Sequence, residues 1–251
     1  MEEKLATLQE WINESTNIVV FTGPGMSVES GVPNFRVATE ENLKRYGGVP
    51  PEAIMSRTYM ERRPAPFFRF YREQVLTPLL EAEPHEGHKK LVELEQSGRL
   101  RTVITQNMDD IHQEAGSKKV LEMFGSVMKN YCTHCDQKYS AMDILEKPGI
   151  PYCDVDMCGK VMRPDIVLYG EAFKEEVMVD IVYHILMADL FIIAGASLSE
   201  QAAASLACYY DRKKLVLIGN EPEHSLDQRA NLILRGSIAD TLGALEITPK
   251  E

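Results

Sequence analysis

The sequence lacks a segment that would carry the chain across a membrane. Its most apolar stretch, residues 186–198, contains Asp189 and is shorter than the roughly 20 residues that span a bilayer. The first ten residues include four charged side chains and no apolar run, so we expect no signal peptide. These absences predict a cytoplasmic protein with no membrane partner.

Positive charge is also scarce. The chain has 27 Lys and Arg against 38 Asp and Glu, a net charge of −11. Such a surface repels a phosphate backbone, so we do not expect a nucleic-acid partner. There is no internal repeat or low-complexity tract, and 44% apolar content is typical of a globular protein. A chain of 251 residues predicts one main domain with room for small insertions, and its oligomeric state is open.

Four short apolar runs predict buried strands. They are residues 17–22, which lead into Gly23-Pro24-Gly25, and residues 102–105, 190–194 and 215–218. Stretches with helical character separate them, and the first ten residues also look like the start of a helix. This alternation predicts an α/β fold with a doubly wound parallel sheet. Residues 37–83, rich in Arg, Pro and Phe, predict a helical insertion.

Four of the five cysteines form two close pairs. Two residues separate Cys132 from Cys135, and after seventeen further residues Cys153 is separated from Cys158 by four. In a reduced compartment this spacing favours a four-thiolate zinc site over disulfides. A closed site of this kind stabilises its module and does not react. Cys208, in an Ala-rich helical stretch, is expected in the core.

The turn after the first strand, residues 23–27, can bring backbone N–H groups and a helix start to a pyrophosphate. Two features of the dinucleotide-binding fingerprint are missing. Val28 occupies the place of the third glycine, and no acidic residue ends a second strand about 20 residues later. Pro24 also has no N–H. Taken alone, the turn fits a plain loop as well as a phosphate site.

Further segments occur in a fixed order. Residues 23–36 read GPGMSVESGVPNFR, residues 105–116 read TQNMDDIHQEAG, and residues 122–126 read EMFGS. After the cysteines come RPDIVLYGE at 163–171, GASL at 195–198 and LVLIGN at 215–220. This series resembles the sirtuin family over nearly the whole chain.

The resemblance implies a Rossmann-like sheet with a helical insertion and a small zinc module. We assign residues 1–36, 84–128 and 164–251 to an NAD-binding domain, residues 37–83 to the helical insertion and residues 129–163 to the zinc module. The implied activity is that of an NAD-dependent protein-lysine deacylase, or deacetylase. Such an enzyme transfers the acyl group of a modified lysine to ADP-ribose through an alkylimidate and releases nicotinamide. NAD and one structural zinc ion are the implied cofactors, and an acylated-lysine protein or peptide is the implied partner.

The resemblance also assigns site residues. Asn107, Asp109 and Phe124 occupy catalytic positions. Residues expected to hold NAD are Gly23, Gly25, Ser27, Phe35, Arg36, Gln106, Asn107, Asp109, Gly195, Ser197 and Asn220. Val167, Leu168, Tyr169 and Gly170 would present a strand edge to an extended peptide. The four cysteines would hold the metal.

Several of these residues have a plainer explanation. Asn107 and Asp109 could cap a helix that begins near Asp109. Phe35 could belong to the core, Arg36 could be a surface side chain, and residues 167–169 could form an ordinary interior strand.

Position 124 departs from the family, which uses a histidine there as general base. Phe124 cannot accept a proton, and loss of a general base costs on the order of 10²–10⁴ in rate. We therefore expect weak deacylation. ADP-ribosyl transfer or NAD hydrolysis stays open, as does non-catalytic binding of NAD, ADP-ribose or an acyl-peptide.

Other positions bear on the same question. His88 and His112 are the alternative bases, and His85 is expected at the surface. Asn34 stands where the family has Asp, and Pro24 and Met26 replace small residues of the turn. Several differences around one pocket indicate natural divergence.

Overall fold

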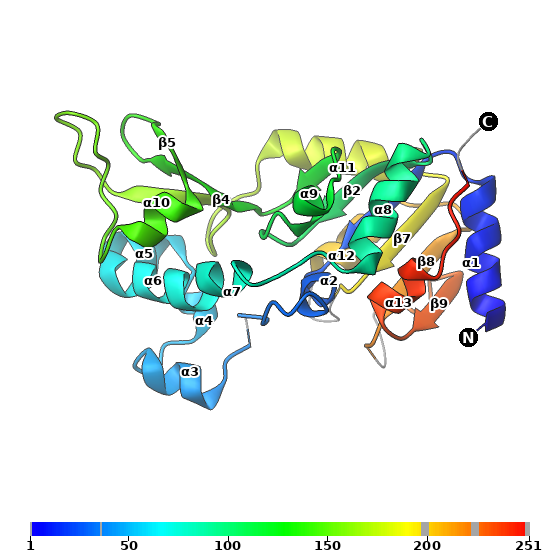
Figure 1. Ribbon diagram of the computed structural model, residues 1–251, viewed down its shortest axis with the longest axis horizontal. Coiled ribbons are helices and arrows are strands. Elements are labelled where there is room, and N and C mark those ends of the chain that lie inside the picture. Colours follow the sequence, from blue (N-terminus) through cyan, green and yellow to red (C-terminus); the bar gives the residue numbers. More distant parts are fainter. Residues whose placement is uncertain (1, 36, 197–200, 222–225, 249–251) are drawn as a thin grey trace.

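The computed structural model describes residues 2–35, 37–196, 201–221 and 226–248, and a six-stranded sheet forms its centre (Figure 1). The strand order is β3-β2-β1-β7-β8-β9, and every neighbouring pair is parallel. The strands are β1 (Ile18–Thr22), β2 (Leu100–Thr105), β3 (Val120–Glu122), β7 (Leu190–Ala194), β8 (Leu215–Gly219) and β9 (Leu232–Arg235). Along the chain, β2 and β3 add to one side of β1, and β7, β8 and β9 then add to the other side. The predicted doubly wound sheet is confirmed, and its switch point lies between β1 and β7.

Helices cover both faces of this sheet, which explains why its central strands are apolar at nearly every position. Strands β1, β7 and β8 are buried at all five residues each. Alternate side chains such as Val20 and Ile192 pack under α1 (Glu2–Glu14), α8 (Glu86–Gln96) and α13 (Ile238–Gly243). Those of the other face, such as Phe21 and Phe191, pack under α11 (Glu175–Met187) and α12 (Gln201–Ala207).

A second group of elements lies at the end of the molecule opposite the two termini (Figure 1). It contains a three-stranded antiparallel sheet in the order β5-β4-β6 and the helices of the predicted insertion. Its elements are α3 (Glu40–Arg45), α4 (Pro51–Ile54), α5 (Arg57–Arg62), α6 (Pro64–Phe70), the π-helix η1 (Tyr71–Leu76), α7 (Thr77–Leu79), β4 (Gly125–Cys132), β5 (Lys138–Ser140), α10 (Ala141–Glu146) and β6 (Met162–Ile166). One apolar cluster, which includes Phe67, Tyr71, Ile144 and Met162, joins these helices to the small sheet.

Two short helices come after the central strands. Helix α2 (Pro24–Val28) starts directly after β1, and α9 (Ile111–Ala115) comes after the loop that ends β2. Both lie at the carboxyl edge of the parallel sheet, where ligands of doubly wound folds bind. Among the described residues, no helix is both long and apolar enough to span a bilayer.

The side chain of Arg72 connects the helical insertion to α10, the helix beside the small sheet. Its guanidinium donates to the carbonyl oxygens of Ile144 at 2.8 Å and Lys147 at 2.5 Å, at the carboxyl end of α10. We predict that Arg72→Ala lowers the free energy of unfolding by about 2–3 kcal/mol, because two carbonyls lose a charged donor. Urea unfolding measures this. Arg57→Ala is the control, because Arg57 pairs with Glu61 at the exposed surface. If Arg72→Ala and Arg57→Ala had the same free energy of unfolding, the stabilising role given to Arg72 would be contradicted.

Candidate functional site

Two glycine-containing turns pack directly on each other at the switch point. After β1, Gly23 N donates to Ala194 O at 3.0 Å and Gly25 N donates to Gly195 O at 2.8 Å. A Cβ on Gly23 would lie 2.5 Å from the Ala196 Cα, and one on Gly25 would lie 2.8 Å from the Gly195 Cα. Gly195 itself has φ +66°, a conformation that favours glycine. These glycines therefore allow the turns to approach, and the N–H groups of all three donate to carbonyls within the protein.

Two adjoining cavities lie at this edge of the sheet, and the larger of these two opens beside the turns. It has a volume of about 420 Å³ and lies at the carboxyl ends of β1, β7, β8 and β9. Its lining includes Gly25 and Gly195 from the turns, and Asn220 and Arg235 from the ends of β8 and β9. An elongated ligand can bind here across the switch point.

A smaller cavity of about 40 Å³ adjoins the larger one. Pro24, Val28 and Asn34 line both cavities, so one ligand can extend from the first into the second. Some residues that line the smaller cavity were expected from the sequence, and others were not. The expected ones are Ser27, Phe35, Asn107 and Asp109, and the others include Gln74, Val75, Leu79, Met108 and Val127. The unexpected residues come mainly from the insertion and from β4, and no local pattern marks them.

A buried polar network lies along the smaller cavity. The Asn107 side-chain amide donates to Ser27 Oγ at 2.7 Å and to Gly23 O at 3.0 Å. Ser27 Oγ in turn donates to the Asp109 carboxylate. Burial raises the pKa of Asp109, while the hydrogen bond from Ser27 opposes that rise. Three expected site residues are thus brought together from two distant segments.

The plainer interpretation of Asp109 is correct in part. Helix α9 begins at Ile111, and its N-cap residue is Asp110, which has φ +61°. The Asp109 carboxylate nevertheless accepts the Ile111 N–H at 3.1 Å. Asp109 therefore supports the helix start and faces the cavity at once. Gln106 contributes a buried Oε1 that has no hydrogen-bond partner among the described residues.

Phe124 lies between β3 and β4, where the two lobes meet. Its partly buried ring packs against one core cluster of the parallel sheet and against the cluster of the second lobe. It makes an edge-to-face contact with Phe173, with ring centroids 5.2 Å apart and planes at 68°. The side chain fits its surroundings as an apolar group and supplies no proton acceptor.

The alternative bases do not face the cavities. His88 and His112 are 0% and 1% exposed, and burial lowers the pKa of His88 to about 2 and that of His112 to about 3. Neither lines the two cavities. The surface expectation for His85 is wrong, because its ring is half-buried and donates to Met26 O at 3.0 Å.

The expected peptide-binding residues form a loop after β6, which ends at Ile166. Val167 N donates to Phe124 O at 2.9 Å, and Tyr169 makes backbone hydrogen bonds with Met55 and Arg57 of the insertion. Leu168 N donates to the Glu171 carboxylate at 3.0 Å, and Arg163 forms two hydrogen bonds to that carboxylate at 2.8 and 2.9 Å. Gly170 has φ +88°. The loop is held from three sides beside position 124.

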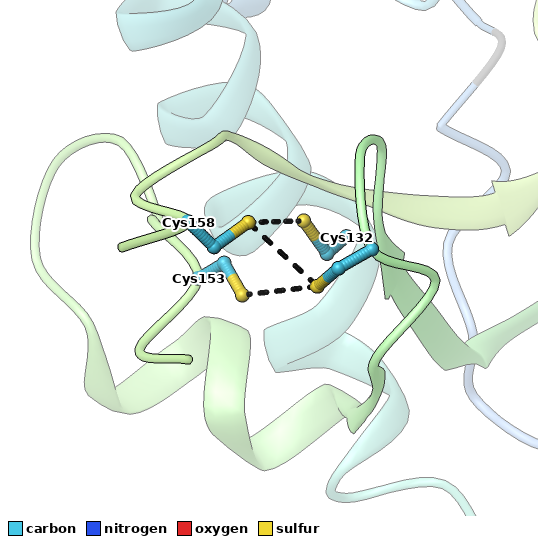
Figure 2. A group of neighbouring side chains, drawn as sticks. Cys132, Cys153 and Cys158 are labelled. Carbon is cyan, nitrogen blue, oxygen red and sulfur yellow. Dashed lines mark hydrogen bonds between the residues drawn. The ribbon is translucent and has the colours of Figure 1, made fainter. Parts of the chain in front are cut away.

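The four paired cysteines meet in the small sheet's lobe (Figure 2). All four Sγ atoms lie within 4.8 Å of one another, and neighbouring pairs are 3.5 to 3.7 Å apart. A tetrahedral zinc ion with Zn–S bonds of about 2.3 Å requires sulfur atoms about 3.8 Å apart. The residues therefore fit one structural zinc ion. Cys208 is exposed and not in the core, so that expectation is wrong.

Two expected residues, Arg36 and Ser197, lie outside the described residues. Asn220 is exposed and lines the larger cavity.

Comparison with known proteins gives a consistent result. The Sir2 family model matches residues 23–202. An NAD-dependent protein deacetylase of Clostridium perfringens is 40% identical over 244 residues, which is 97% of this chain and 98% of that protein. The NAD-dependent protein deacetylase of Cutibacterium acnes is 38% identical over 95% of this chain and 96% of its own.

Solved structures are similar over the same length. A sirtuin structure on substrate affinity has a TM-score of 0.85 at 33% identity, covering 94% of this chain and 95% of that one. A Sir2 complex with a p53 peptide and NAD⁺ has a TM-score of 0.81 at 32% identity and covers 95% of both chains.

We predict that Cys135→Ser reduces the zinc content of the purified protein well below one equivalent and lowers its melting temperature, because a three-thiolate site binds zinc less tightly. Metal analysis by mass spectrometry and thermal unfolding measure both. The matched control is Cys208→Ser, which replaces an exposed thiol outside the cluster. Full zinc retention by Cys135→Ser would contradict the site.

We predict that the protein loses stability as pH falls below about 6.5. His88 and His112 keep depressed pKa values only in the folded chain, so below the unfolded value of about 6.5 protons bind preferentially to the unfolded chain. At pH 5.5 this lowers the free energy of unfolding by about 1.4 kcal/mol for each histidine. Urea unfolding at two pH values measures the loss. His88→Leu reduces the pH dependence, and equal wild-type stability at both pH values would contradict the prediction.

Proposed function

The chain belongs to the Sir2 family, and from that premise we propose that it is an NAD-dependent protein-lysine deacylase whose turnover is limited by Phe124. Its substrate is an acylated lysine in a peptide or protein, and the acyl group is transferred to ADP-ribose. The single observation that carries the proposal is the buried network of Ser27, Asn107 and Asp109 beside two adjoining cavities at the switch point.

The cavities adjoin at the switch point of the sheet, where doubly wound folds bind dinucleotides. The larger one, beside the glycine turns and Asn220, would hold the adenosine and diphosphate half of NAD, with Ser197 close by in sequence. The smaller one, with Phe35, Asn107 and Asp109, would hold the nicotinamide riboside half, and Arg36 would contribute from the same segment. NAD supplies a ribose carbon that becomes electrophilic as nicotinamide leaves.

The network gives the nicotinamide end a fixed polar wall. Because Asn107 is hydrogen bonded to Gly23 O and Ser27 Oγ, its amide is held in one orientation. The Asp109 carboxylate, in a water-poor setting, would stabilise positive charge that develops on the ribose. Gln106, next to Asn107 in the chain, has a buried Oε1 without a partner among the described residues and would offer it to a donor.

Position 124 governs the step after nicotinamide loss. A general base would take the proton of the attacking ribose hydroxyl, and Phe124 cannot do so. His88 and His112 are buried away from the cavities. Within the first turnover we therefore expect nicotinamide release to be faster than release of the deacylated peptide by a factor on the order of 10²–10⁴.

The loop of residues 167–170 would bind the peptide backbone. Val167 N donates to Phe124 O, so the loop adjoins position 124, beside which we propose that the acyl-lysine would bind, and Tyr169 is half exposed. Relatives of known structure include Sir2 bound to a propionylated peptide. Peptide binding by β-augmentation at this loop is the recognition mode we propose.

We place the boundaries of the NAD-binding domain at residues 1–36, 84–128 and 164–251, with the helical insertion at 37–83 and the zinc module at 129–163. A reduced, cytoplasmic setting fits the paired cysteines and the zinc site. Neither a nucleic acid nor a membrane is part of the proposed function.

A second candidate function is favoured by Phe124 itself. ADP-ribosyl transfer or NAD hydrolysis needs nicotinamide loss but not the step that the base serves. Mass spectrometry of the protein with NAD and an acetyl-lysine peptide distinguishes these functions. Deacylated peptide with acyl-ADP-ribose supports the deacylase, and nicotinamide without deacylation supports transfer or hydrolysis. No product at all would leave a protein that acts by binding.

We predict that Phe124→His raises the rate of deacylation by a factor on the order of 10², because an imidazole titrates near neutral pH and can act as the missing base. The rate of peptide deacylation at saturating NAD measures the gain. Phe124→Leu is the control, since it shortens the side chain without adding a base. No gain for Phe124→His would mean that Asn34 or the turn at residues 24–26 also limits the reaction.

A further inference from the structure

His85 connects helix α8 to the turn at residues 23–27. It precedes α8, where its Nδ1 accepts the Gly87 N–H at 3.0 Å. Its Nε2 lies 3.0 Å from Met26 O, in the turn after β1. Because the Gly87 N–H can only donate, Nδ1 carries no proton, and because a carbonyl can only accept, Nε2 carries one. A single neutral tautomer therefore satisfies both contacts.

The ring of His85 begins a column of three buried or half-buried imidazoles. Its centroid is 4.2 Å from that of His88, which is 4.8 Å from that of His112. At the far end, His112 Nε2 lies 3.0 Å from Thr22 Oγ1, at the end of β1. Within the described residues, both ring nitrogens of His88 lack a partner. The column thus links α8 to the turn and to the strand that carries it, without a counter-charge inside it.

Gly87 leaves the space that the His85 ring occupies. A Cβ on Gly87 would lie 2.8 Å from His85 Cε1 and 3.0 Å from His85 Nδ1, while the nearest other atom, the Ala239 Cα, is 3.4 Å away. An alanine at position 87 would therefore displace the imidazole and little else. Alanine is otherwise the better residue in a helix, so this glycine has a local steric role.

The turn that His85 contacts contains Ser27, which belongs to the buried polar network of the site. Met26 N donates to Gly23 O at 3.0 Å, and a Cβ on Gly195 would lie 2.6 Å from Met26 N. The next residue, Ser27, bonds to Asn107 and Asp109. A shift of the Met26 carbonyl would therefore move the residues that we assign to NAD.

We propose that His85 is a positioning residue for NAD binding, whose neutral imidazole fixes the turn at residues 23–27 and whose protonation releases it. The inference rests on the proposed NAD-dependent function. Protonation of Nδ1 would set one N–H donor against another, that of Gly87, so the charged ring loses the cap of α8. Nε2–H can still donate to Met26 O, but the ring then no longer connects α8 to the turn.

The groups that face His85 set the pH range of this release. Burial lowers the pKa of His85 overall, although the hydrogen bond to Met26 O, Glu29 at the end of α2 and Glu86 in α8 favour the charged form. From the column, His88 and His112 stay neutral beside it. From α13, the neighbour at Gly87 is the uncharged Ala239. Because the pKa of His85 is lowered, NAD affinity is expected to fall only at a pH below the ordinary imidazole value of about 6.5.

Titration calorimetry of the full chain with ADP-ribose, from about pH 8 to about pH 5.5, tests this with two variants. His85→Asn keeps a side-chain acceptor for the helix cap but cannot titrate in this range. Gly87→Ala keeps the histidine but displaces it. We expect wild-type affinity to fall by about tenfold per pH unit below the His85 pKa. Both variants should bind about three- to tenfold more weakly than wild type at about pH 8, with little further change on acidification.

Thermal unfolding of each variant at each pH shows whether weaker binding comes from displacement of the turn or from unfolding of the whole protein. The inference is overturned if His85→Asn shows the wild-type pH profile, or if Gly87→Ala binds with wild-type affinity at every pH. Either result leaves the proposed function standing, provided that the wild type binds ADP-ribose at about pH 8. A wild type that does not bind ADP-ribose there overturns both.

Discussion

The close approach of two turns at the centre of the parallel sheet is the constraint on which the site depends. The turns after β1 and β7 meet with less than 3 Å available for a Cβ on Gly23, Gly25 or Gly195. Because the backbones touch, Ser27 is fixed beside the loop after β2, and the larger cavity opens on the same edge. The same turns close the switch point of the sheet, so fold and ligand site share one set of contacts.

Phe124 lies where that site meets the second lobe. It packs on clusters of both lobes and contacts Phe173, so the position is structurally satisfied by an apolar ring. Its backbone carbonyl also holds the loop of residues 167–170 through Val167 N. An apolar ring at this position therefore preserves the connection between the lobes but supplies no proton acceptor. At position 124 an apolar ring is therefore sufficient for packing but not for proton transfer.

Much of the fold could be predicted from the sequence, because the buried central strands are β-branched runs that end in turns. Strands β3 and β9 went unpredicted since they are short and only partly buried, and β4 and β5 because the cysteine module shows little periodicity. The zinc site could be predicted from the spacing of the four cysteines alone. The Ser27 to Asn107 contact joins residues 80 apart, which no local pattern encodes, and only the family resemblance pointed to it. The burial of His85 likewise depends on Gly87 and Met26, which meet only in the folded chain.

The central claim is that the pocket still cleaves NAD and that Phe124 slows only a later step. Exchange of labelled nicotinamide into NAD, in the presence of an acetyl-lysine peptide, reports the first step separately from product formation. The account predicts exchange that exceeds peptide deacylation in the same sample by a factor on the order of 10² or more. Exchange that is absent, or no faster than deacylation, would contradict it.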